Sequence, residues 1–205
     1  MRFSIIVPSY LGSYQGAATN REQKIVRMIE SVMCQTFQDF ELIIVADGCE
    51  RTIEICKPYF YEYLPKIRLL SVEKQKTWSG KIRNAGISKA QGDIITYVDL
   101  DDKVLPNHLQ IINDNFGDAD WVYADHLTWS KTAQEFVPYH TNIEITGMCG
   151  TSSISHKRSM NAYWLSNNYL HDKVFIDTLK IISKNYKRIP QTGYCVCHAP
   201  NQFDV

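Results

Sequence analysis

The chain has 205 residues, enough for one compact domain and short for two. Apolar residues make up 44% and charged residues 21%, which is typical of globular proteins and argues against wholesale disorder. The 22 basic and 22 acidic residues cancel, which disfavours a nonspecific nucleic-acid binder because such proteins carry a basic excess. Any phosphate must therefore be bound by a local site.

The sequence indicates neither targeting nor membrane insertion. No apolar run approaches the ~20 residues of a membrane-spanning helix. Pro8 ends the short apolar stretch at the N-terminus before it reaches the length of a signal-peptide core. The six cysteines form no Cys-x-x-Cys pair, which is typical of reduced thiols packed as small core residues. We therefore expect a cytoplasmic protein without a transmembrane segment, for which peripheral association with a membrane or a partner protein stays open.

Apolar runs and helical periodicities alternate along the first half of the chain. Four runs of strand length predict buried strands at Phe3–Val7, Leu42–Ala46, Ile67–Val72 and Ile94–Val98. Helices are expected around residues 25–33, at Thr52–Cys56 with an end near Pro58, at Lys81–Ala90, and after Pro106. Alternation of this kind predicts a mainly parallel sheet with helices on both faces.

The second half is less regular. Residues 121–129 alternate loosely, residues 147–155 are small and polar, Val174–Ile182 has the pattern of an amphipathic helix, and Tyr194–His198 that of a last strand. We therefore predict a single α/β domain of mixed, mainly parallel, Rossmann-like architecture. Residues 1–105 would form a nucleotide-binding half, and residues 106–205 would close over it.

Polar and acidic residues follow three of the predicted strands: Pro8-Ser9-Tyr10, Asp47-Gly48 and Asp99-Leu100-Asp101-Asp102. The carboxyl ends of parallel strands meet at one edge of a sheet, where ligands bind. Three carboxylates within four residues repel one another unless they are solvated or bind a cation, and their oxygens suit Mg²⁺ or Mn²⁺. An acidic turn ahead of a helix is the alternative. With Asp47 at a neighbouring strand end, we favour a divalent metal that also holds a diphosphate.

Five motifs occur in the order and spacing of a known family. They are SIIVPSY at residues 4–10, SVxxQTF at 31–37, ELIIVADG at 41–48, RNxGI at 83–87 and YVDLDD at 97–102. On these motifs the chain resembles the family 2 glycosyltransferases of the GT-A fold, in a short, bacterial-type form. The resemblance implies an inverting enzyme of polysaccharide or glycoconjugate synthesis. Such an enzyme moves a sugar from a nucleoside-diphosphate donor to a hydroxyl of a glycan, lipid-linked or other acceptor.

The resemblance implies roles for the strand-end residues. The nucleotide sugar would be bound by Pro8, Ser9, Tyr10, Asp47, Arg83, Asp99 and Leu100. The Asp47 carboxylate only accepts hydrogen bonds, so it suits a base with a ring N–H, such as uracil, thymine or guanine. The ring of Tyr10 could stack on the base. The planar, positively charged guanidinium of Arg83 could bind the base or a phosphate. The plainer alternatives are an Asp-Gly turn for Asp47 and an exposed helix position for Arg83.

Metal ligands and a base are implied in the same way. Asp101, with Asp99 and His198, would bind Mn²⁺ or Mg²⁺, which neutralises the departing diphosphate. Asp102 would cap the next helix or orient its neighbours. Asp172, preceded by His171 where the family usually has Glu, matches the general base that takes the proton of the acceptor hydroxyl. The next candidate for the base is Asp125. The plainer alternatives are a strand histidine for His198 and a helix cap for Asp172.

Three positions depart from the family pattern: Ala46 where many members have Asp, Leu11 where Asn is common, and Cys49 where Ser is frequent. The chain also stops earlier than many relatives, so we expect an acceptor site that is open or completed by a partner. Two other functions stay open. One is a non-catalytic nucleotide-sugar-binding module. The other is a Mg²⁺-dependent phosphotransferase or phosphatase of the haloacid-dehalogenase type, which the position of DxD after the fourth strand disfavours.

Overall fold

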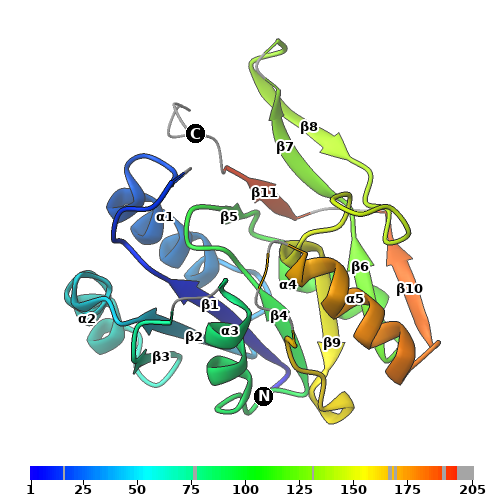
Figure 1. Cartoon of the computed structure of the whole chain (residues 1–205), viewed down its shortest axis with the longest axis horizontal. Coiled ribbons are helices and arrows are strands. Elements are labelled where there is room, and N and C mark those ends of the chain that lie inside the picture. Colours follow the sequence, from blue (N-terminus) through cyan, green and yellow to red (C-terminus); the bar gives the residue numbers. More distant parts are fainter. Residues whose placement is uncertain are drawn as a thin grey trace.

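Seven strands in the described part of the chain form one sheet, in the order β10-β6-β9-β4-β1-β2-β3 (Figure 1). The structure is a computed structural model that describes residues 1–15, 17–75, 78–130, 132–165, 168, 170–190 and 193–197. The strands are β1 (Phe3–Ser9), β2 (Phe40–Asp47), β3 (Ile67–Val72), β4 (Ile94–Tyr97), β6 (Trp121–Ala124), β9 (Ile154–Lys157) and β10 (Tyr186–Ile189). The pairings are parallel except those of β9 with β4 and β6. The expected mixed, mainly parallel sheet is confirmed.

Helices cover both faces of this sheet. α1 (Arg21–Met33), α2 (Glu50–Glu62) and α4 (His108–Phe116) pack on one face, and α3 (Gly80–Ile87) and α5 (His171–Ile182) on the other. Successive residues of a strand point to opposite faces. Ile5 therefore belongs to the same core cluster as Met28 of α1, while Ile6 belongs to that of Ile82 of α3. Burial on both faces explains why the strands are continuous apolar runs.

A second, smaller sheet has the order β5-β11-β7-β8 among the described residues. Its strands are β5 (Lys103–Val104), β7 (His126–Ser130), β8 (Glu135–Tyr139) and β11 (Tyr194–Val196), and the 3₁₀ turns Thr151–Ser153 and Arg158–Met160 flank β9. The β7–β8 hairpin projects from the body of the molecule, next to β11 (Figure 1). No helix in the described ranges is long and apolar enough to cross a membrane.

Several helices differ from their predicted bounds: α1 begins at Arg21, before residue 25, and α3 ends at Ile87, before Ala90. The expected end of a short helix near Pro58 is wrong, because α2 continues to Glu62. Proline removes the hydrogen bond to the carbonyl four residues earlier. Pro58 and Glu54 are both exposed, so water can satisfy that carbonyl. α5 begins at His171, three residues before the predicted helix, and this places Asp172 in its first turn.

The RNxGI motif brings α3 close to the sheet and to the second half. A Cβ on Gly86 would lie 2.7 Å from Cγ2 of Ile6, so only glycine permits this approach of α3 to β1. Asn84 donates from Nδ2 to the carbonyl of Trp164 and accepts from its N–H, at 2.9 and 2.8 Å. The motif therefore fixes the segment that precedes α5.

Glu41 ties together the end of the sheet remote from the predicted site. The residue is 1% exposed and accepts hydrogen bonds from Ser4 Oγ (2.6 Å), Gln91 N (2.6 Å) and Arg68 Nη1 (2.9 Å). Burial by itself raises the pKa of the carboxyl, but these donors outweigh it and bring the pKa below its ordinary value. The ionised carboxylate therefore stabilises the fold.

We expect Glu41→Gln to lower the free energy of unfolding by about 1–3 kcal/mol at pH 7, because the amide replaces an ionised acceptor shared by three donors. The folded pKa lies below the unfolded one, so the stabilisation is present above pH 4.5 and is lost as the pH falls through the folded pKa. Urea unfolding at pH 7 and at acid pH measures both. If the difference in unfolding free energy between wild type and Glu41→Gln does not shrink at acid pH, this role of Glu41 is contradicted.

Candidate active site

One cleft of about 1150 Å³ collects the predicted site residues at the carboxyl ends of β1, β2 and β4. Its lining includes Pro8, Ser9, Tyr10, Asp47, Arg83, Asp99, Leu100, Asp101 and Asp172. His198 lies outside the described residues. Since parallel strands end at one edge, residues from three strand ends meet there, and α5 adds Asp172 from the second half.

Arg83 holds Asp99 in the lining of this cleft. The guanidinium is buried, donates from Nη2 to Asp99 Oδ1 (2.7 Å) and from Nη1 to Ser79 Oγ (2.5 Å), and lies 4.8 Å from the ring of Trp164. Burial raises the pKa of Asp99, Arg83 lowers it, and Asp101 and Asp172 raise it further. The net shift is upward. The Arg83 guanidinium is therefore already hydrogen-bonded within the protein, and it orients the Asp99 carboxylate.

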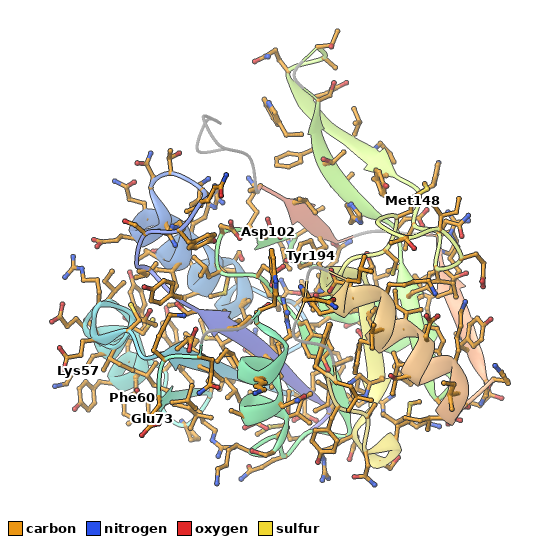
Figure 2. The ribbon with its side chains drawn as sticks, in the orientation of Figure 1. Lys57, Phe60, Glu73, Asp102, Met148 and Tyr194 are labelled. Carbon is orange, nitrogen blue, oxygen red and sulfur yellow. The ribbon has the colours of Figure 1, made fainter. Side chains whose placement is uncertain are left out.

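Asp102 accepts hydrogen bonds from β11 and from the residue that follows this strand. It is 3% exposed and accepts from Tyr194 Oη (2.7 Å) and from Cys197 N (2.6 Å), while Tyr194 Oη itself accepts from Asp99 N (2.9 Å). Figure 2 shows Asp102 and Tyr194 side by side at the centre of the molecule. Burial raises the pKa of Asp102 well above its ordinary value, and Asp101 and Asp99 add to the rise. Asp102 thus orients its neighbours, and it does not cap α4, which begins at His108.

Asp99 and Asp101 fit a hard divalent cation. Both line the cleft, and their repulsion contributes to the raised pKa of Asp99. Within the described residues, no group of three or more His, Cys, Asp or Glu side chains is arranged to hold a metal by itself. Mg²⁺ usually binds through one or two carboxylates, with substrate phosphates and water as its other ligands. Two carboxylates beside room for a diphosphate match that kind of site.

Asp47 and Tyr10 lie together at the ends of β2 and β1. Asp47 is 5% exposed and accepts from Lys74 Nζ (2.5 Å) and from Gln75 N (2.7 Å). Lys74 Nζ also lies 3.9 Å from the centroid of the Tyr10 ring. Gly48 makes room for this contact: its φ is 57°, and a Cβ there would lie 2.6 Å from Lys74 Cβ. The Asp47 carboxylate, a hydrogen-bond acceptor, and the flat ring of Tyr10 thus lie next to each other.

Asp172 enters the cleft from the first turn of α5, where the helix dipole stabilises a carboxylate. Thr151 Oγ1 donates to its Oδ1, and His171 Nδ1 lies 3.4 Å from the same atom. The His171 ring packs between Trp78 and Trp164, at centroid distances of 5.9 and 5.6 Å. Burial lowers the pKa of His171, against the opposing effect of Asp172, so the imidazole is neutral near pH 7.

Asp125 has the contacts of a structural carboxylate. It is 3% exposed, binds Arg188 through both oxygens (2.9 and 2.5 Å), and also accepts from His140 Nδ1 (2.8 Å) and Thr141 N (3.1 Å). Burial raises its pKa, but these donors bring the pKa below its ordinary value. Asp125 is not among the residues that line the cleft in the described part of the chain. These contacts weaken the case for it as the base.

Comparison with known families shows to which family the chain belongs. Residues 4–170 match the family described as glycosyl transferase family 2. The chain belongs to this family. The matched segment contains every assigned strand-end residue from Pro8 to Asp101, as well as Trp164. Family 2 membership removes the phosphatase alternative.

Curated and solved members of the glycosyltransferase group are similar to the chain. The uncharacterized glycosyltransferase YwdF of Bacillus subtilis is 32% identical over 180 residues, which are 85% of this chain and 61% of YwdF. Staphylococcus aureus TarS 1–349, solved with UDP-GlcNAc, superposes with a TM-score of 0.75 at 19% identity over 98% of this chain and 60% of TarS. The mannosyltransferase PcManGT of Pyrobaculum calidifontis, solved with GDP-Man and Mn²⁺, gives 0.69 at 13% identity over 98% of this chain and 58% of its own. The chain thus spans about three fifths of these relatives, and the expected GT-A fold is confirmed.

Sequence reasoning on this family 2 chain missed three residues that shape the site: Lys74, Thr151 and Tyr194. Lys74 lies two residues beyond the end of β3, so the strand-end rule that found Asp47 and Asp99 also covers it. Thr151 belongs to the small polar segment 147–155, which shows no chemistry of its own in the sequence. Tyr194 reads as an ordinary strand residue, and only folding places its hydroxyl against Asp102.

Proposed function

We propose that the protein is an inverting glycosyltransferase that moves a sugar from a nucleoside-diphosphate donor to an acceptor hydroxyl. The observation that carries this proposal is that strand-end residues of the first half and Asp172 of the second line one cleft. A single displacement needs the leaving group and the base on opposite sides of the reacting carbon. The first half would bind the leaving group, and the second half would supply the base. Family 2 membership supports the same reaction.

The nucleoside of the donor would bind at the ends of β1 and β2, against Pro8, Ser9, Tyr10 and Asp47. The base would stack on Tyr10 and donate a ring N–H to Asp47. TarS was solved with UDP-GlcNAc and PcManGT with GDP-Man, and uracil and guanine both carry a ring N–H. A UDP-type donor is favoured.

The diphosphate would lie beside Asp99, Leu100 and Asp101. A divalent cation there, Mn²⁺ or Mg²⁺, supplies neutralisation of the leaving group, and the Mn²⁺ of PcManGT supports this. Arg83 keeps Asp99 pointing into the cleft, and Tyr194 keeps the segment 99–102 in place through Asp102. These positioning contacts resist the repulsion of the clustered carboxylates.

Asp172 would take the proton of the acceptor hydroxyl as the new bond forms. The hydrogen bond that orients its carboxylate, from Thr151 Oγ1, is on Oδ1. We therefore assign the proton-accepting role to Oδ2. Residues 106–205 would bind the acceptor, and both its class and a cytoplasmic place of action stay predictions from the sequence. A non-catalytic module would bind the donor without transferring the sugar.

Stabilisation by UDP should depend on Mn²⁺. We expect Mn²⁺ to increase the rise in melting temperature that UDP causes, because binding to the folded state stabilises it by mass action. Asp101→Ala should abolish the metal-dependent part, while the control Asp114→Ala, on the exposed side of α4, should not. Thermal-shift assays with and without Mn²⁺ measure this. Full Mn²⁺ dependence in Asp101→Ala would show that the metal ligand is misassigned.

UDP, dTDP and GDP should bind more tightly than CDP and ADP, by about 1.5–3 kcal/mol, because only the first three offer a ring N–H to Asp47. Calorimetric titration in the presence of Mn²⁺ measures the difference. Asp47→Asn should reduce the preference, since the amide can also donate. Equal affinity for UDP and CDP in the unmodified protein would rule out this role of Asp47.

Asp172→Asn should lower the rate of transfer by a factor of about 10²–10⁴, the usual contribution of a positioned base, and leave UDP affinity nearly unchanged. Asp177→Asn, on the exposed side of the same helix with a side chain 47% exposed, is the matched control and should transfer normally. His171→Ala should do less damage than Asp172→Asn. Near-normal transfer by Asp172→Asn would place the base elsewhere.

A further inference from the structure

One ammonium group contacts both elements of the proposed nucleobase site. Lys74 Nζ lies 2.5 Å from Asp47 Oδ2 and 3.9 Å from the centroid of the Tyr10 ring. It also donates to the carbonyl of Gln75 at 3.0 Å. Lys74 therefore bridges the carboxylate that would accept the ring N–H and the aromatic face on which the base would stack.

The position of this group conflicts with a stacked base. Atoms of two stacked rings are separated by the van der Waals distance of about 3.5–4.0 Å. Nζ at 3.9 Å from the ring centroid lies within that layer. A base that reaches Asp47 while it stacks on Tyr10 must use the ring face turned toward Asp47, and Lys74 occupies that face. The two cannot be there together.

The contacts of Lys74 are weak enough to exchange. Its side chain is 42% exposed, and water competes for both the ion pair and the cation–π contact at such a position. Asp47 keeps its hydrogen bond from Gln75 N at 2.7 Å when the lysine leaves. A ring N–H would then replace the donor that Lys74 withdraws.

We infer that Lys74 competes with the nucleobase for Tyr10 and Asp47, and so sets the affinity of the protein for its donor. The inference rests on the proposed function, because it takes Tyr10 and Asp47 as the nucleobase site. Donor binding then exchanges a lysine side chain for a base, without a change in backbone. Lys74 is a residue that lowers donor affinity in the wild-type protein, in contrast to Arg83 and Asp101.

The test uses uridine because it has no phosphate. Removing the charge of Lys74 therefore cannot weaken binding through a lost attraction to a diphosphate. Lys74→Met keeps an unbranched side chain, one atom shorter than lysine, and removes the charge. We expect it to bind uridine about 3- to 10-fold more tightly, since an ion pair and a cation–π contact made by a lysine whose side chain is 42% exposed each contribute only a few-fold. Lys81→Met, at an exposed position of α3, is the matched control and should bind like wild type. Ligand-observed NMR titration gives the affinities.

A direct readout follows the side chain itself. With ¹³Cε-labelled lysine, the Hε protons of Lys74 should be shifted upfield in the free protein by the Tyr10 ring current. Saturation with uridine should move them toward the position of an exposed lysine, and the signal is assigned by its loss in Lys74→Met. Unchanged or weaker uridine binding by Lys74→Met, or a signal that stays upfield at saturation, would overturn the inference.

Calorimetry with UDP and Mn²⁺ distinguishes failure of this inference from failure of the proposed function. If the uridine or NMR result contradicts the inference but UDP still binds, only the inference fails; if neither uridine nor UDP binds either protein, the proposed function fails too.

Discussion

Repulsion between the carboxylates of Asp99, Asp101 and Asp102 is the constraint around which the site is built. Burial of like charges within four residues is unfavourable unless each has its own partner. Arg83 binds Asp99, and Tyr194 and Cys197 bind Asp102. These partners come from α3 and from β11 with the residue that follows it. Two segments far apart in the chain therefore converge on one short loop.

The contacts of Asp102 and Asp99 differ in kind. The hydrogen bonds to Asp102 come from β11 and from Cys197, the residue that follows it. Burial together with the neighbouring Asp101 and Asp99 raises the pKa of the Asp102 carboxyl well above the ordinary value. Asp99 shares its charge with Arg83. The loop thus separates three chemically identical side chains into different environments. Asp102 orients the loop, Asp99 pairs with Arg83, and Asp101 lines the cleft beside them.

The antiparallel strand β9 connects the two halves. It pairs with β4 on one side and β6 on the other, so the first half and the second share a single sheet. Thr151 lies in the turn just before β9 and donates to Asp172 of α5. Asn84 of α3 meanwhile holds the backbone of Trp164, whose ring packs on Phe175 of α5 at 4.0 Å. The position of Asp172 relative to the strand ends therefore depends on the shared sheet as well as on α5.

The sequence by itself determined the alternation of strands and helices in the first half, because buried strands and amphipathic helices impose different apolar periods. It also located Asp47, Asp99 and Asp101, since parallel strands end at one edge of a sheet. The extent of α2 beyond Pro58 depended on which helix face meets water, which no local pattern records. Lys74 over Tyr10, Tyr194 against Asp102 and Thr151 against Asp172 were decided only by the tertiary structure. Each is a contact between residues distant in the chain, and its geometry exists only after the layers have packed.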